Sequence, residues 1–214
     1  SKSMKFVLVS TARAGSSFVV RDLAKKFNID FNYDEILNSR RMYEFFPGFG
    51  KGTVYVKNNS LVKLNSDTDN FYERQLQSWK KSDVVSCKLL SHQILKTPNH
   101  VTEGILEEAD TIAYLYRKDS TAQVYSAIIS KKLKQHLPRV EAKDKTFIDI
   151  TQEDFNSQSQ DLLESNLCIK ELLGKYPGKV YCLEDDFDHK PYADVYDYDK
   201  SFTYKLQNIQ DLFK

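Results

Sequence analysis

Cysteine is scarce in this sequence, which has three among its 214 residues: Cys87, Cys168 and Cys182. They are isolated, odd in number and surrounded by apolar residues. This pattern favours buried thiols in a reducing compartment over a disulfide framework. The four histidines are not spaced as metal ligands with one another or with cysteine. We therefore expect no metal site.

The sequence also lacks an excess of either charge and any long hydrophobic run. Lys and Arg number 31 and Asp and Glu 30, a net charge of +1. This balance gives no bulk attraction to nucleic acid or to an anionic membrane. No apolar stretch approaches transmembrane length, and no signal peptide pattern precedes the first strand-like segment. We expect a cytoplasmic protein whose partners are neither nucleic acids nor membranes.

Glycine and proline are few, at seven and five, and no repeat or low-complexity linker divides the chain. With 41% hydrophobic residues, the sequence can bury a substantial core. The prediction is one domain over 1–214, with residues 1–3 interpreted as a tag remnant or a frayed native end.

Apolar β-type runs alternate with helical patterns along the chain, which predicts an α/β fold with a largely parallel sheet flanked by helices. The apolar stripe of the first helix is predicted to contain Phe18, Val19, Leu23 and Phe27. Predicted strands cover 5–10, 83–90, 111–116 and 179–183, and predicted helices cover 16–27, 67–81, 97–108, 119–135, 151–173 and 202–212.

The loop between the first predicted strand and helix contains Arg13, Gly15, Ser16 and Ser17. Backbone N–H groups at a helix start are unpaired, and the helix dipole favours an anion there. Gly15 allows close approach of a ligand, and the serines add hydroxyl donors. By itself this stretch fits an anion cradle or simply a well-capped helix after a buried strand.

A second basic residue, Arg117, stands at the carboxyl end of the strand predicted over 111–116, and Ser126 follows on the next helix. Ligand sites of α/β sheets lie at this edge. The two residues fit an anion site. Equally, Arg117 fits a surface ion pair with Asp119, and Ser126 fits a small residue chosen for close packing.

Three further segments have two interpretations each. Residues 34–38 fit a helix start or place Glu35 as a general base near the loop. Residues 40–66, aromatic and basic, fit an acceptor-side lid or a surface hairpin through 53–56. The acidic run 184–186 fits a Mg²⁺ ligand set or, more commonly, a solvated turn. The glycine-rich run 47–52 lacks phosphate-loop spacing and is interpreted as a mobile turn.

Residues 11–18 read Thr-x-Arg-x-Gly-Ser-Ser-Phe, and this motif resembles the first signature of sulfotransferases that use 3′-phosphoadenosine 5′-phosphosulfate (PAPS). The segment with Arg117, Gln123 and Ser126 is similar to the second signature, in the spacing of bacterial trehalose 2-sulfotransferase relatives. Weaker similarities to that branch lie at Glu35, at Lys88 with the following glutamine, and at residues 181–185.

The resemblance implies a P-loop-like sulfotransferase fold and transfer of a sulfuryl group from PAPS to a hydroxyl of a small molecule or carbohydrate, without a metal. It implies 3′-phosphoadenosine 5′-phosphate (PAP) as the product. For the general base, Glu35 is the first choice and His92 the second. The expected catalytic residues are Arg13, Glu35 and His92, and the expected nucleotide-binding residues are Arg13, Ala14, Gly15, Ser16, Ser17, Phe18, Arg117 and Ser126.

Two other functions stay open at this stage. One is a small-molecule kinase or nucleotide hydrolase on a degenerate P-loop, although ordinary P-loops carry a lysine directly after the last glycine, where this chain has Ser16. The other is a non-catalytic nucleotide-binding protein of the same fold.

Overall fold

The central element is a sheet of four parallel strands in the order β4-β1-β5-β6, comprising β1 (Phe6–Ser10), β4 (Ser86–Leu90), β5 (Thr111–Tyr116) and β6 (Lys179–Cys182). A separate antiparallel hairpin joins β2 (Val54–Lys57) and β3 (Ser60–Lys63). These elements come from a computed structural model that describes residues 4–30, 35–38, 54–57, 60–63, 71–133, 147–189 and 196–202, with the backbone alone for the hairpin strands.

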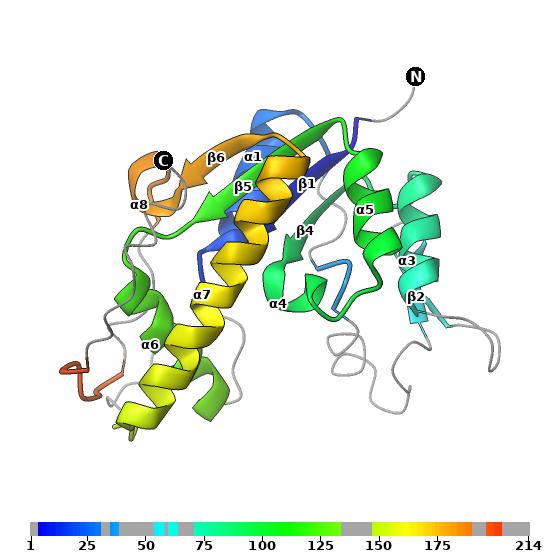
Figure 1. The fold of residues 1–214 in the computed structure, drawn as a ribbon. Helices are drawn as coiled ribbons and strands as arrows, with labels where there is room; N and C mark the ends of the chain where they lie inside the picture. The colour runs from blue at the N-terminus through cyan, green and yellow to red at the C-terminus, as the bar shows by residue number, and fades with distance from the viewer. Residues whose placement is uncertain are drawn as a thin grey trace.

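Helices cover both faces of the sheet, and in Figure 1 the helices α1 and α7 lie on opposite sides of it. The α3 and α5 helices lie side by side at the β4 end of the sheet, on the same face as α7. The helices are α1 (Ser16–Lys26), α3 (Phe71–Lys80), α4 (Ser91–Ile94), α5 (Asn99–Glu107), α6 (Ser120–Leu133), α7 (Gln152–Lys175) and α8 (Leu183–Asp186).

Alternation of side chains along β1 divides the core into two layers. Phe6 and Leu8 pack with α1 and α8, whereas Val7 and Val9 pack with α3, α5 and α7. All four side chains are fully buried. Because both faces of the strand are covered, its sequence is a continuous apolar run, as is typical of a parallel sheet.

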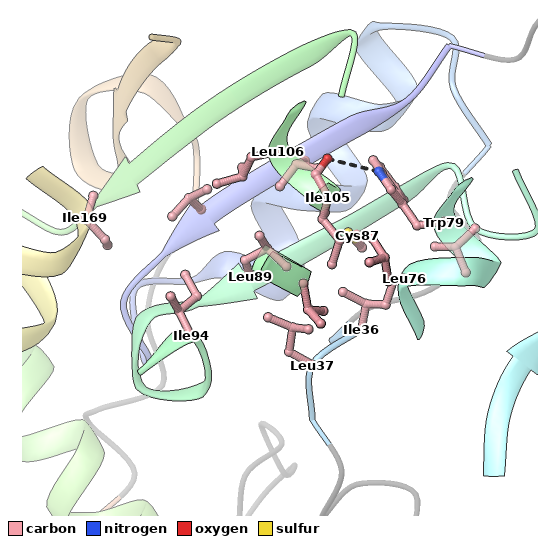
Figure 2. Close-up of a cluster of buried hydrophobic side chains, with 14 of the residues drawn as sticks. Ile36, Leu37, Leu76, Trp79, Cys87, Leu89, Ile94, Ile105, Leu106 and Ile169 are labelled. Atoms are coloured by element: carbon pink, nitrogen blue, oxygen red, sulfur yellow. Dashed lines mark hydrogen bonds between the residues drawn. The ribbon is translucent and has the colours of Figure 1, made fainter. Parts of the chain in front are cut away.

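The larger layer surrounds Trp79 of α3, which is fully buried. Figure 2 shows its indole beside Leu76, with Ile105 and Leu106 of α5 nearby. The indole Nε1–H donates to the Ile105 carbonyl oxygen at 3.0 Å. This bond satisfies a polar group whose burial without a partner would cost roughly 1–3 kcal/mol.

The start of α7 is fixed by a reciprocal cap. The Thr151 hydroxyl accepts from the backbone N–H of Asp154 at 3.1 Å, and the Asp154 carboxylate accepts from the backbone N–H of Thr151 at 2.9 Å. Two helix-terminal donors are thereby satisfied. The predicted helix start at this threonine is confirmed.

The predicted α/β class with a parallel sheet and flanking helices is confirmed, and the strand predicted over 111–116 agrees with β5. The hairpin alternative for residues 53–56 is confirmed by β2 and β3. The predicted lid over 40–66, the turn at 47–52 and the helix over 202–212 lie almost wholly outside the described residues. The single domain over 1–214 stays a prediction.

Three local predictions are wrong. Phe18 does not belong to the buried stripe of α1, since it is 38% exposed while Val20 and Ala24 are buried. Residues 35–38 form a bridge and a turn rather than a helix start, with Glu35 paired in parallel to Lys88. The last strand ends at Cys182, where α8 begins.

In the described chain none of the three cysteines forms a disulfide. Cys87 and Cys182 are buried as predicted, whereas Cys168 is half-buried. Among the described residues, no helix has the length and apolarity needed to cross a membrane.

The strand order changes direction between β1 and β5. The chain leaves β1 towards β4 on one side and leaves β5 towards β6 on the other. Adjacent parallel strands whose connections diverge leave a crevice beyond their carboxyl ends. The residues that follow Ser10 and Tyr116 are therefore placed at this crevice.

Gly178 and Gly174 give a matched test of how the turn between α7 and β6 packs against β5. A Cβ on Gly178 would lie 2.3 Å from the Ile112 carbonyl oxygen, whereas nothing lies within 4 Å of a Cβ on Gly174. Gly178→Ala should destabilise the fold by about 1–3 kcal/mol through overpacking. Gly174→Ala, on α7, should be neutral or stabilising by up to about 1 kcal/mol. Urea unfolding checks both, and equal effects would contradict this packing.

Candidate anion-binding site

The loop between β1 and α1 contains two residues in the left-handed backbone region, Arg13 at φ 62° and Gly15 at φ 76°. Alternation of this kind turns successive N–H groups to one side and forms a concavity suited to an anion. A Cβ on Gly15 would lie 2.8 Å from Leu183 Cδ1, so α8 packs tightly against the loop. Glycine is needed here for both its backbone conformation and its size.

Side chains from β5 and α6 hold the loop carbonyls. Gln123 Nε2 donates to Thr11 Oγ1 at 2.6 Å and to the Ala12 carbonyl oxygen at 2.7 Å. Arg117 Nη1 donates to the Arg13 carbonyl oxygen at 3.3 Å. Because these carbonyls accept hydrogen bonds, the loop is held in one conformation. Its backbone N–H groups are followed directly by those of the first turn of α1. The first N–H groups of a helix have no partner within it and can bind an anion.

Arg13 and Arg117 lie next to one another at the crevice between β1 and β5. Arg13 Nε donates to Ser126 Oγ of α6 at 3.0 Å. Burial and the positive charge of Arg117 lower the pKa of Arg13. Burial also lowers the pKa of Arg117, although the carboxylate of Glu184 opposes this shift. Two desolvated cations side by side favour an anion between or beside them.

Arg117 has an unused donor. Its side chain is 5% exposed, and Nε lacks a hydrogen-bond partner among the described residues. The Glu184 Oε1 atom lies 3.8 Å from it, too far for a hydrogen bond. A buried cationic donor without a hydrogen bond is costly, and a bound anion would relieve that cost.

The acidic run after β6 binds backbone N–H groups. Glu184 accepts from the N–H of Lys118 at 2.7 Å and from that of Asp119 at 3.0 Å. These bonds lower the pKa of Glu184 although its burial alone would raise it. The Asp119 carboxylate accepts from the N–H of Ala122 at 2.9 Å, and the carboxylate within 4 Å of Arg117 in the described chain is that of Glu184, so the alternative of a surface ion pair between Arg117 and Asp119 is not what the structure shows. No group of metal-binding side chains occurs in the described parts of the chain.

A second polar cluster lies on the β4 side of the loop and is centred on Glu35. Glu35 Oε1 accepts from Gln93 Nε2 at 2.7 Å and from Asn38 Nδ2 at 3.2 Å. The Lys88 ammonium lies 3.8 Å from Oε2. The same ammonium donates to Ser16 Oγ at 3.2 Å and to Ser17 Oγ at 2.5 Å. The carboxylate is thus held close to the start of α1.

His92 is exposed on α4, whereas its neighbours Ser91 and Gln93 are buried. It is Gln93 that contacts the Glu35 carboxylate. The sequence signal for the partners of Glu35 was a basic residue, Lys88, within an apolar strand, followed by polar residues at the end of that strand.

An aromatic pair lies beside the loop and was not predicted. His189 stacks on Phe18 with ring centroids 4.6 Å apart and an interplanar angle of 17°. Phe187 meets the same phenyl ring edge-on. Burial and the charge of Arg117 lower the pKa of His189, so its ring is predominantly neutral at pH 7. Phe18 thus packs against the rings of His189 and Phe187 and is not among the buried residues of α1.

The structure brings most of the predicted site residues together. Arg13, Arg117 and Ser126 meet on the β5 side of α1, and Glu35 reaches the other side through Lys88. The loop residues with Ala14, Gly15, Ser16, Ser17 and Phe18 lie between them. No family model matches the sequence, and a comparison with curated proteins finds no significant relative.

Replacing Glu184 tests how the β5–α6 turn is held. Because the folded-state pKa of Glu184 lies below its ordinary value of 4.5, its charged form stabilises the fold above that pH. That contribution should be lost as the pH falls through the folded pKa. Glu184→Gln should cost about 1–2 kcal/mol at pH 7, and the difference from wild type should shrink below about pH 4.

Urea unfolding at pH 7 and pH 3.5 measures this difference. The control is Asp185→Asn, because the Asp185 carboxylate is exposed and lies 3.5 Å from the Lys118 ammonium. It should change stability by less than about 0.5 kcal/mol. A constant deficit of Glu184→Gln at both pH values would contradict the role of its charge.

Proposed function

We propose that this protein is a PAPS-dependent sulfotransferase that acts on a hydroxyl group of a small molecule or carbohydrate. The observation that carries the proposal is the adjacent pair of guanidinium groups beyond the carboxyl ends of β1 and β5, half-buried Arg13, which donates to Ser126, and buried Arg117, which donates to the Arg13 carbonyl oxygen. The motif resemblance at residues 11–18 and 117–126 supports the same function.

The donor carries two separate anionic groups, a 3′-phosphate and a 5′-phosphosulfate, and the site offers two sets of donors. The first set is the N–H groups and hydroxyls at the start of α1, around Ser16 and Ser17. The second is Arg117 with Ser126, where Arg117 Nε lacks a hydrogen-bond partner in the described chain. The residues therefore fit the donor in charge and in number of sites.

The chemistry assigned to Glu35 is that of a general base. Its carboxylate takes the proton of the acceptor hydroxyl while that oxygen forms a bond to the donor's sulfur. The bond from sulfur to the bridging phosphate oxygen breaks, and its electron pair stays on the phosphate. Base catalysis of this kind contributes about 10²–10⁴ in rate. Contacts from Gln93 and Asn38 to Oε1 hold the carboxylate in place.

Arg13 and the loop N–H groups would stabilise the charge that builds on the departing phosphate oxygen. One well-placed donor contributes about 3–4 kcal/mol to such a transition state. Arg13 reaches the site from a left-handed backbone conformation that its hydrogen bond to Ser126 helps to hold. Its replacement should therefore affect both nucleotide affinity and turnover.

Nucleotide binding is the first test. Isothermal titration calorimetry with PAP should give micromolar affinity. Arg13→Ala and Arg117→Ala should each weaken it about 10-fold or more, because each removes a charged donor. The control is Arg21→Ala, an exposed arginine on the same helix as the loop serines. Tight binding of Mg²⁺–ATP without binding of PAP would indicate the kinase or hydrolase alternative instead.

Turnover is the second test, with PAPS and a panel of sugars and phenols, and with the mass of the product as the readout. Glu35→Gln should lower turnover by about 10²–10⁴ while PAP affinity stays within a few-fold. His92→Ala should have little effect if Glu35 is the base. Retained PAP binding without turnover of any acceptor would favour the non-catalytic alternative.

A further inference from the structure

Lys88 links the two loop serines to the Glu35 carboxylate. It lies on β4, its side chain is 3% exposed, and its ammonium is close to oxygens of Ser16, Ser17 and Glu35. It is not among the residues to which the sequence assigned a role at the nucleotide. Its contacts call for an explanation, since burying a lysine is costly.

The direction of the hydrogen bonds from Lys88 is fixed by chemistry. An ammonium group has three donors and no acceptor, whereas a hydroxyl has one donor and two lone pairs. The oxygens of Ser16 and Ser17 must therefore accept from Lys88, at 3.2 and 2.5 Å. The hydroxyl hydrogens then point away from Lys88 and are available to another acceptor.

Serine near a helix start commonly turns its hydroxyl to the carbonyl four residues earlier. For Ser16 and Ser17 these carbonyls belong to Ala12 and Arg13. The first already accepts from Gln123 and the second from Arg117. Each carbonyl therefore has one lone pair already engaged, which weakens its competition for the hydroxyl hydrogen and favours donation into the cradle at the start of α1.

We infer that Lys88 is a positioning residue that makes the two loop serines hydrogen-bond donors towards a phosphate or sulfate oxygen. The same ammonium lies beside the Glu35 carboxylate, so it also sets the distance between the loop and this base. The inference rests on the proposed function only in taking the loop as an anion site. It assigns Lys88 a role through the serines rather than a contact with the ligand.

A double-mutant cycle tests this role. Binding of PAP and, separately, of inorganic pyrophosphate is measured by calorimetry for wild type, Lys88→Met, the serine variant Ser16→Ala/Ser17→Ala, and the double variant that combines both changes. Lys88→Met and the serine variant should each weaken binding about 10-fold or more, because each removes hydrogen bonds to a charged ligand. The double variant should be no more than about 3-fold weaker than the serine variant, since the effect of Lys88 is transmitted through these two hydroxyls.

Lys5→Met is the matched control. Lys5 is also a buried lysine close to a carboxylate, 3.2 Å from Glu108, but it lies at the amino end of β1, away from the loop. Its loss should lower stability in urea without changing pyrophosphate affinity. If Lys88→Met does not fold, Lys88→Met/Glu35→Gln compared with Glu35→Gln makes the same measurement without removing the nearby positive charge from a half-buried carboxylate.

The outcomes are distinct. An additive loss of about 100-fold in the double variant would overturn the inference and make Lys88 an independent contributor. An unchanged affinity in Lys88→Met would overturn it as well. If wild type binds pyrophosphate but not PAP, the proposed function is wrong. The inference about Lys88 is then tested by the pyrophosphate affinities of the same variants. If it binds neither, the proposed function and the inference fail together.

Discussion

Two like charges held side by side out of water are the constraint on which the rest of this site depends. Arg117 is buried and Arg13 half-buried, and each pKa is lowered because burial disfavours the charged form. A fold that keeps two guanidinium groups in this state must offset the cost by hydrogen bonds and by nearby negative charge. The hydrogen bonds and the carboxylate around Arg13 and Arg117 offset this desolvation cost.

Most of the compensation comes from segments far apart in the sequence. Ser126 of α6 accepts from Arg13, and the loop's own carbonyl accepts from Arg117. Glu184 brings a carboxylate to within 3.8 Å of Arg117 while binding two backbone N–H groups at the start of α6. Glu184 partly offsets the charge of Arg117. It does not form a hydrogen bond with Arg117 Nε, so this donor can bind a ligand.

The sequence was most informative where one local rule decided the structure. The apolar run of β5 and the threonine cap of α7 were predicted well because burial on both faces and helix capping are local properties. The loop between β1 and α1 was recognised because its glycine, arginine and serines are adjacent in the chain. Its position against α8 follows from tertiary packing and could not be predicted in this way.

The errors have physical causes of the same kind. Phe18 fits the periodicity of a buried stripe, but it stacks on His189, which lies 171 positions later in the chain. His92 and Gln93 are adjacent, and in a helix as short as α4 a rotation of about 100° per residue decides which of them faces Glu35. No periodicity over four residues fixes that angle. Asp119 was one interpretation for a partner of Arg117 because it is near in sequence, whereas the carboxylate of Glu184, far along the chain, lies 3.8 Å from Arg117.

The sheet order explains why the polar groups separate into two sets. With β1 between β4 and β5, residues from β5 and α6 reach the loop from one side and residues from β4 and α4 from the other. The first set carries the guanidinium groups, and the second carries the carboxylate of Glu35 with Lys88 beside it. A group bound at the start of α1 would therefore have fixed positive charge on one side and a proton acceptor on the other. Transfer of an anionic group to a hydroxyl needs this polarity, because the departing oxygen gains charge while the attacking oxygen loses a proton.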